Sequence, residues 1–176
     1  MENMELLWEI FSPYTQKVEL KKKEIILREG VVSDSIFYVE SGCLRSWFNK
    51  DGNDVSFQFF LEGTVVASFE SLWFGDPSPY NIESVLPTTL SVIPISVFNA
   101  KLEESSELKE IIFKHLCHRV RHYQRLFLSR IKDSPQERYE DLIRNNPEII
   151  RQIPQHYIAS YLGVTSVSLS RIRCRK

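Results

Sequence analysis

Residues 153–176 read IPQHYIASYLGVTSVSLSRIRCRK, and this stretch decides how the whole chain is interpreted. Ala159 supplies a residue without bulk where a second helix would cross the first. Gly163 accepts the positive φ that a tight turn between them needs, and Thr165 is a suitable N-cap for the second helix. The apolar residues are spaced as in two short helices that cross through such a turn, at Ile158, Leu162, Val164, Leu169 and Ile172. The stretch therefore predicts a helix-turn-helix unit.

Charge favours DNA as the partner of this unit. No acidic residue follows Glu148, and the chain ends in four exposed basic positions, Arg171, Arg173, Arg175 and Lys176. Residues 1–113 hold 9 Lys or Arg and 18 Asp or Glu, a net charge of −9, whereas residues 114–176 hold 13 and 5, a net charge of +8. In a chain of net charge −1 overall, this division predicts a polyanion partner for the C-terminal part. The alternative is a plain helical hairpin that ends in charged residues.

In residues 18–95, the apolar residues recur with a different spacing. Short segments rich in β-branched and aromatic residues are separated by Gly, Pro and Asp-Gly, which is typical of an antiparallel sandwich or small barrel. Asp51-Gly52 indicates a hairpin turn. Alternation in the next segment predicts one buried face that carries Val55, Phe57 and Phe59. The expected fold class is therefore α+β, with an antiparallel β-barrel or jelly roll followed by helices.

Helices are expected on both sides of the barrel: a short one over residues 4–16, and a long one from about residue 105 to 132. The long helix has apolar residues at alternating spacings of three and four, Phe113, Leu116, Val120, Tyr123 and Phe127. Such a seam needs a partner, which is either the barrel of the same chain or the same helix in a second subunit. Because a two-fold protein suits a DNA-reading module, we expect a homodimer through the long helix.

A new unit is expected to begin just after the long helix. Ser134 as N-cap, Pro135 at the first helical position and Glu137 two residues further on form a clear helix start. We therefore predict two domains: residues 1–132 with the barrel and the long helix, and residues 133–176 with the helix-turn-helix.

The order of barrel, long helix and terminal helix-turn-helix resembles the Crp/Fnr family of bacterial transcription regulators. The resemblance covers nearly the whole chain and is carried by GVVSDSIFYVESGCLR (30–45), the strand-rich stretch to Pro94, and IASYLGVTSVSLSRIR (158–173). It implies a barrel like that of cyclic-nucleotide-binding proteins, a dimer, and double-stranded DNA as the partner. RNA polymerase is a further candidate partner. In such proteins, ligand binding in the barrel reorients the DNA-binding domain.

The sequence departs from the family at the cyclic nucleotide site. Members that bind a cyclic nucleotide carry a Gly-Glu pair for the ribose and an Arg followed by Ser or Thr for the phosphate, which keeps a negative charge. Here Phe69-Glu70 and Tyr80-Asn81 fall at these places, and residues 62–86 contain no Lys or Arg. We therefore expect that neither cAMP nor cGMP binds.

The same stretch is rich in aromatic residues, which leaves two interpretations open. The aromatics either pack the core shut or line an apolar cavity for an unidentified small effector. The candidate pocket residues are Phe57, Phe59, Phe69, Glu70, Trp73, Tyr80 and Asn81.

Alignment with the reading helices of the family assigns roles on DNA. Arg171 is suited to the O6 and N7 atoms of guanine. Val167 stands where many relatives carry Glu, so it can contact only a thymine methyl group or no base at all. Ser166 is the third base-facing position. Phosphate contacts that set the register are expected from Ser168, Ser170, Arg173, Gln155 and His156. The sequence ends at Lys176, before the β-hairpin wing that commonly follows this motif, so we expect either a wingless or a truncated form.

Other functions find little support. Three cysteines without a CxxC pair, Cys43, Cys117 and Cys174, and no export signal predict reduced thiols in the cytoplasm. None of them lies where Fnr-type sensors bind an iron–sulfur cluster, and the barrel has no His for a haem. No run of roughly 18 apolar residues predicts a membrane span.

Metal and enzyme interpretations are weaker still. His115, His118 and His122 share one helical face, but no carboxylate joins them, so we expect no metal site or other cofactor. No nucleophile–base arrangement indicates an enzyme. The remaining alternative is a dimeric small-molecule sensor that does not bind DNA.

Overall fold

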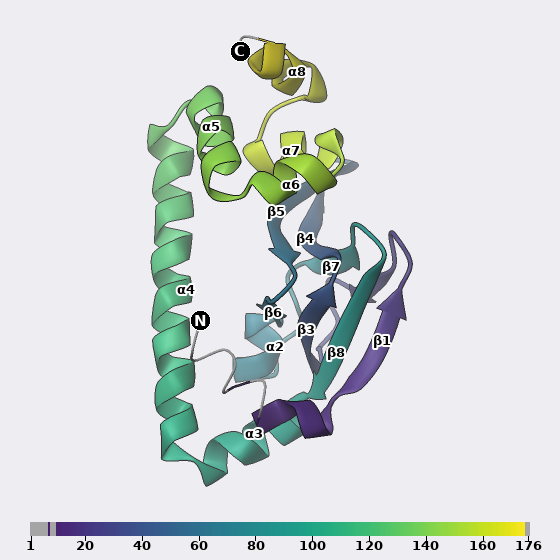
Figure 1. Cartoon of the computed structure of the whole chain (residues 1–176), viewed down its shortest axis with the longest axis vertical. Coiled ribbons are helices and arrows are strands. Elements are labelled where there is room, and N and C mark those ends of the chain that lie inside the picture. The colour runs from purple at the N-terminus through teal and green to yellow at the C-terminus, as the bar shows by residue number, and fades with distance from the viewer. Residues whose placement is uncertain (1–6, 8–9, 175–176) are drawn as a thin grey trace.

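The structure, a computed structural model, describes residue 7 and residues 10–174. Their strands form two four-stranded antiparallel sheets (Figure 1). One sheet has the order β1 (Gln16–Leu20), β8 (Thr88–Pro94), β3 (Ser35–Ser41) and β6 (Val65–Val66). The other has the order β2 (Ile25–Leu27), β7 (Asn81–Ser84), β4 (Cys43–Lys50) and β5 (Asn53–Leu61).

Apolar side chains from both sheets form the interior of this barrel, among them Leu27, Val39, Leu44, Phe60, Val66, Ile82 and Leu90. Burial of so many large side chains is the main favourable term in its folding. The mixed α+β fold with an antiparallel jelly roll is as the sequence predicts.

Helices surround and follow the barrel: η1 (Ser12–Tyr14), α2 (Phe69–Phe74), α3 (Ile95–Glu104), α4 (Ser106–Lys132), α5 (Pro135–Asn145), α6 (Pro147–Gln152), α7 (Gln155–Leu162) and α8 (Ser166–Cys174). Helix α4 stands as a long column beside the barrel, and α5 to α8 gather at one end of both (Figure 1). Of the expected N-terminal helix, Leu7, Ile10 and Phe11 are helical, while its residues 4–6 and 8–9 lie outside the described residues. In the part of the chain that the structure describes, no helix has the length and apolar character needed to cross a membrane.

Two local predictions are confirmed. Asp51 and Gly52 have φ values of 53° and 81° and connect β4 to β5, as a tight hairpin with positive φ at both central residues requires. At the start of α5, the Ser134 hydroxyl accepts from the Glu137 amide at 3.3 Å, and the Glu137 carboxylate accepts from the Ser134 amide at 2.7 Å. This capping box satisfies two backbone donors that would otherwise have no helical partner.

Strand β5 departs from the predicted alternation. Ser56 and Gln58 are buried, whereas the three residues expected inside are only half-buried, Val55, Phe57 and Phe59. The neighbouring pairs are Ser46 with Gln58 and Trp47 with Ser56, so Phe57 has no opposite residue. Burial nevertheless alternates along the strand, with Ser56, Gln58 and Phe60 buried. The prediction that Val55, Phe57 and Phe59 form the buried face is therefore wrong, because the opposite face is buried, where Ser56 accepts from Arg45 and Gln58 accepts from Tyr123.

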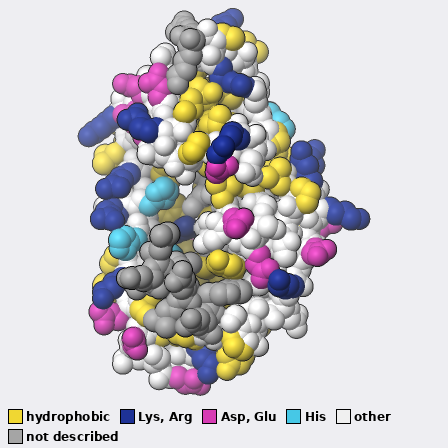
Figure 2. All heavy atoms as spheres, viewed as in Figure 1, with side chains coloured by type: hydrophobic (Ala, Val, Ile, Leu, Met, Phe, Trp, Pro, Cys, Tyr) yellow, Lys and Arg dark blue, Asp and Glu magenta, His cyan; other side chains and the backbone are white. Residues whose placement is uncertain are grey.

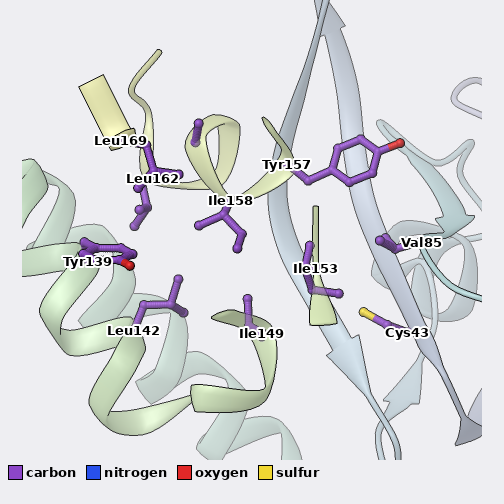
Figure 3. Close-up of a cluster of buried hydrophobic side chains, with 11 residues drawn as sticks. Cys43, Val85, Tyr139, Leu142, Ile149, Ile153, Tyr157, Ile158, Leu162 and Leu169 are labelled. Atoms are coloured by element: carbon purple, nitrogen blue, oxygen red, sulfur yellow. The ribbon is translucent and has the colours of Figure 1, made fainter. Parts of the chain in front are cut away.

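A second buried cluster joins the barrel to the C-terminal helices (Figure 3). Cys43 and Val85 come from the barrel. They pack with buried residues of α5 to α8 and their connections, including Tyr139, Leu142, Ile149, Ile153, Tyr157, Ile158, Leu162 and Leu169. Burial raises the pKa of the Cys43 thiol to about 12, so this thiol is a core residue without thiolate reactivity. The cluster fixes α7 against one end of the barrel.

Candidate nucleic-acid interface

Helices α7 and α8 are joined by the tight turn that the sequence predicts. Gly163 has a φ of 70°, and its N–H donates to the Ser160 carbonyl at 3.0 Å, while the Val164 N–H donates to the Ala159 carbonyl at 2.9 Å. A Cβ atom at Gly163 would lie 2.9 Å from Nη1 of Arg130. Both the positive φ and this close neighbour favour glycine here.

The start and the inner face of α8 also follow the sequence. The Thr165 hydroxyl accepts from the Ser168 amide at 3.1 Å, which satisfies one of the free donors at a helix start. Leu169 is 1% exposed and packs in the shared cluster, with half-buried Ile172 beside it. Helix α8 is thus attached through its apolar side, and its other side remains free.

The free side of α8 carries the basic residues. Arg171 and Arg173 are exposed, and neither makes a hydrogen bond or ion pair with another residue that the structure describes. Val167 is 62% exposed. Ser166 and Ser170 are exposed, whereas Ser168 is half-buried; Arg175 and Lys176 lie outside the described residues. The structure therefore places five of the eight residues predicted to contact DNA on one exposed helix side: Ser166, Val167, Ser170, Arg171 and Arg173.

The two predicted contacts at the start of α7, Gln155 and His156, are both exposed. The His156 ring lies 4.0 Å from the Tyr157 ring, and its pKa is lowered by partial burial and then by the charges of Arg45, Lys23 and Lys22. These neighbouring positive charges disfavour the charged form of His156, so its expected contact to a phosphate is a hydrogen bond.

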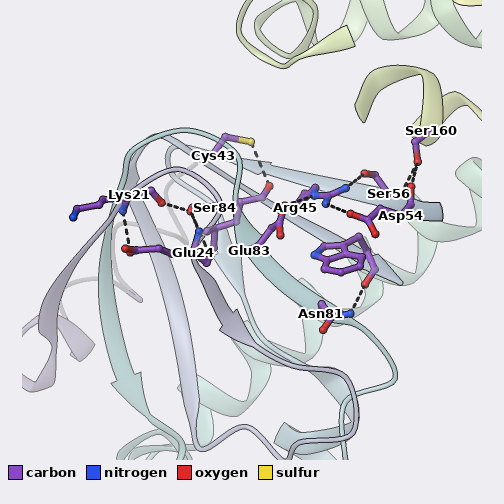
Figure 4. A network of polar contacts seen from close by, with 12 residues as sticks. Lys21, Glu24, Cys43, Arg45, Asp54, Ser56, Asn81, Glu83, Ser84 and Ser160 are labelled. Atoms are coloured by element: carbon purple, nitrogen blue, oxygen red, sulfur yellow. Dashed lines mark hydrogen bonds and ion pairs between the residues drawn. The ribbon is translucent and has the colours of Figure 1, made fainter. Parts of the chain in front are cut away.

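One buried arginine lies where the barrel meets α7 (Figure 4). Arg45 of β4 is 1% exposed. Its Nε donates to Glu83 Oε1 at 2.8 Å, its Nη1 to the Ser56 hydroxyl at 2.8 Å, and its Nη2 to Asp54 Oδ2 at 3.0 Å. The guanidinium lies 4.0 Å from the centre of the Tyr157 ring. A buried cation is tolerated when it is paired and hydrogen-bonded in this way.

Further contacts tie α7 to β5. The Ser160 hydroxyl accepts from the Ser56 amide at 2.8 Å and donates to the Asp54 carbonyl at 3.0 Å. The Phe59 and Tyr161 rings lie 5.3 Å apart. This interface was not predicted from the sequence, because nothing near Arg45 in the chain distinguishes it from an ordinary strand residue.

The predicted pocket residues do not gather around one cavity. Tyr80 packs against Phe57 with ring centres 5.1 Å apart, but Phe59 turns to α7, and Trp73 packs on Phe98 at 6.2 Å. Phe69 is 49% exposed. Glu70 lies in the first turn of α2, and the Asn81 side chain accepts from the Glu29 amide at 3.0 Å. The aromatic side chains thus serve several separate contacts.

A cation from α4 faces this side of the barrel and was not anticipated. The Arg119 guanidinium carbon lies 5.9 Å from the Phe60 ring, and its Nη2 donates to the Tyr123 hydroxyl at 2.9 Å. The Tyr123 hydroxyl donates in turn to Gln58 Oε1 at 2.7 Å. Residues 62–86 hold no positive charge, and α4, distant in the sequence, supplies one at this side of the barrel.

The apolar residues predicted to form the seam of α4 differ in their exposure and contacts. Phe113, Val120 and Phe127 are 66%, 58% and 66% exposed, at intervals of seven residues. Leu116 is half-buried, and the Tyr123 hydroxyl contacts the barrel. Tyr123 therefore contacts the barrel of the same chain, whereas Phe113, Val120 and Phe127 remain exposed.

The histidines of α4 do not converge on a metal-binding arrangement. His118 Nδ1 lies 3.0 Å from Arg121 Nη2. Burial and then neighbouring charges, of which Arg119 is the largest, lower the pKa of both His115 and His122. Residue 7 and residues 10–174 contain no group of three or more His, Cys, Asp or Glu side chains that could ligate a metal.

Comparisons with known proteins agree with this architecture. Residues 17–105 match the cyclic nucleotide-binding domain family. FixK2 from Bradyrhizobium japonicum is 19% identical with a TM-score of 0.79, over 92% of this chain and 83% of FixK2. The c-di-GMP-responsive global regulator CLP from Xanthomonas campestris is 16% identical with a TM-score of 0.72, over 95% and 88% of the two chains.

A protein from Eubacterium rectale assigned to the Crp/Fnr transcriptional regulators is 18% identical with a TM-score of 0.74, over 93% and 79% of the two chains. No curated protein matches the sequence. At these identities the solved structures establish a shared fold.

Arg45→Met tests the junction between the barrel and α7. The change leaves the buried Glu83 carboxylate without its partner and removes the cation over Tyr157, so we expect the free energy of unfolding to fall by about 3–5 kcal/mol. Lys17→Met is the control, because it breaks a pair whose lysine is exposed and should cost far less. Urea unfolding of both variants measures the difference. Equal losses in the two would contradict the structural importance of Arg45.

Proposed function

The chain belongs to the cyclic nucleotide-binding domain family, and we propose from this premise that it is a DNA-binding transcription regulator of the Crp/Fnr type. Residues 1–132 would form the sensor unit and residues 133–176 the DNA-binding unit. A cytoplasmic location and contact with RNA polymerase follow from this role, and no enzymatic activity is proposed.

The observation that carries the proposal is the division of α8 into two sides. Leu169 is buried against the body of the protein, whereas Arg171 and Arg173 are exposed and make no contact that neutralises them within the described residues. An attached helix with unpaired guanidinium groups on its outer side suits the major groove, where arginine recognises guanine edges and phosphates. We assign base contacts to Ser166, Val167 and Arg171.

Helix α4 supports a two-fold dimer. Phe113, Val120 and Phe127 form an exposed apolar stripe with the heptad repeat of a coiled coil, and Ile131, 67% exposed, lies at its end. Pairing of this stripe with its copy would remove four large side chains of each chain from water. A two-fold arrangement would also present two copies of α8 to a palindromic site with half-sites about one helical turn apart.

The barrel is proposed not to respond to cAMP. Burial is the main cause that raises the pKa of Tyr80 to about 12, with the nearby Glu70 carboxylate as a further cause. A cyclic phosphate placed beside Tyr80 would therefore meet a neutral phenol and a carboxylate. Arg119 of α4 places a cation at this side of the barrel, but its guanidinium group already donates a hydrogen bond to the Tyr123 hydroxyl. An effector that binds in the barrel would be uncharged or would differ in shape from a cyclic nucleotide.

Val120→Glu tests the dimer. Glutamates from two subunits would face each other in an apolar seam, and their unpaired burial should split the dimer. His118→Glu is the matched control, because it adds the same charge to the same helix away from the stripe. Sedimentation velocity at micromolar concentration should show a dimer for the wild type and the control and a monomer for Val120→Glu. A monomeric wild type would contradict this part of the proposal.

Thermal unfolding tests the ligand prediction. A ligand that binds only the native state raises the melting temperature, so saturating cAMP should leave that temperature unchanged. A dose-dependent rise would overturn the prediction. Arg119→Gln would then show whether α4 supplies the counter-charge, since the rise should vanish in that variant.

Substitutions of Arg171 and Arg173 together test the proposal that the protein binds DNA. Arg171→Ala should weaken specific binding by roughly 1–3 kcal/mol per half-site and relax preference at one base pair. Arg173→Ala should weaken binding to all sequences alike and reduce the salt dependence. Competition assays with a selected site and random duplexes distinguish the two losses. If neither change alters affinity, the α7–α8 unit does not bind DNA, and the chain is a dimeric sensor.

A further inference from the structure

A cavity of about 430 Å³ lies at the junction of α4, α5 and α7. This volume lies within the roughly 300–1,000 Å³ typical of small-molecule sites. Apolar walls come from Leu126 of α4, Leu142 of α5 and Leu162 of α7. Basic side chains and histidines follow the edge formed by α4 (Figure 2). None of the residues assigned to DNA or to the barrel pocket lines this cavity.

The cavity is strongly cationic. Arg125 and Arg130 from α4 and Arg138 from α5 line it with His122, while Asp141 is the one carboxylate among the lining residues. The Asp141 carboxylate accepts from the Asn145 side chain at 2.7 Å. No ion pair involves any of these three arginines among the residues that the structure describes. Three guanidinium groups thus line one cavity, and no ion pair within the described residues neutralises them.

Two of the guanidinium groups are held in fixed positions. Arg130 Nη2 donates to the Tyr161 carbonyl, and Arg138 donates to the Leu162 carbonyl at 2.9 Å and to the Asp133 carbonyl at 2.6 Å. These acceptors are neutral, so they orient the groups and leave the charges in place. Arg138 Nε is buried and has no hydrogen-bond partner. Partial burial, and then the charge of Arg138, lower the pKa of Arg130.

We propose that this cavity binds a phosphate-bearing small molecule, with Arg125, Arg130 and Arg138 as the anion-binding groups. Guanidinium groups match phosphate oxygens in pairs, and an anion would relieve the repulsion between the clustered cations. The volume exceeds that of a phosphate ion and the walls include leucines, so the ligand has an organic part. Because the arginines come from both sides of the α4–α5 connection, a bound ligand would bridge the long helix and the C-terminal helices. Any effect on DNA reading rests on the proposed function; the binding itself does not.

Calorimetric titration of the full chain with inorganic pyrophosphate, without DNA and at constant ionic strength, tests the site. We expect one binding event per chain for the wild type. Arg125→Gln should weaken it roughly tenfold, the loss of one charge-assisted hydrogen bond. This change should not disturb folding, since Arg125 is exposed and makes no hydrogen bond with the described residues; its melting temperature checks this.

Two further variants make the result decisive. Asp141→Asn removes the opposing carboxylate at nearly constant shape, so pyrophosphate should bind more tightly. Arg144→Gln removes an arginine of the same α5 helix that does not line the cavity, so affinity should equal that of the wild type. Absence of binding, or equal affinity in all four proteins, would overturn the proposal. Loss of DNA affinity in Arg125→Gln with unchanged pyrophosphate binding would assign the arginine to DNA phosphates instead.

Discussion

The position of the C-terminal helices against the barrel depends on the contacts of the buried Arg45 guanidinium. Its nitrogens are paired with Glu83, Ser56 and Asp54, and its face lies against Tyr157 of α7. Taking a cation out of water costs several kcal/mol unless such partners are present. Because α7 covers this cation and the barrel strands pair it, each part stabilises the arrangement of the other.

Strand β5 connects the two helical parts of the molecule. Its Ser56 amide donates to Ser160 of α7, and its Gln58 side chain accepts from Tyr123 of α4. A change at Ser56 would therefore reach α7 and a change at Gln58 would reach α4, each through a direct hydrogen bond. This placement gives a physical route by which an event at the barrel could alter the position of α8, and it needs only the hydrogen bonds described.

What the sequence predicted well is local. The turn at Gly163, the capping box at Ser134 and the hairpin at Asp51-Gly52 depend on residues within a few positions of each other, so composition and spacing reveal them. The contacts that were missed join distant residues. Ser56 and Ser160 are separated by 104 positions, and Arg119 reaches the barrel from another element. Nor does alternation reveal that the buried face of β5 carries Ser56 and Gln58, because their partners Arg45 and Tyr123 belong to other elements.

Native-state hydrogen exchange tests most directly whether Arg45 joins the barrel and the C-terminal helices into one cooperative unit. Amides of a single unit open together with one free energy, whereas separate units open independently. We predict that the slowest amides of α7 exchange with the same opening free energy as those of β4, and that Arg45→Met lowers the value for α7. If α7 in the wild-type protein opened at a much smaller free energy while β4 stayed protected, the buried arginine would not couple the two parts.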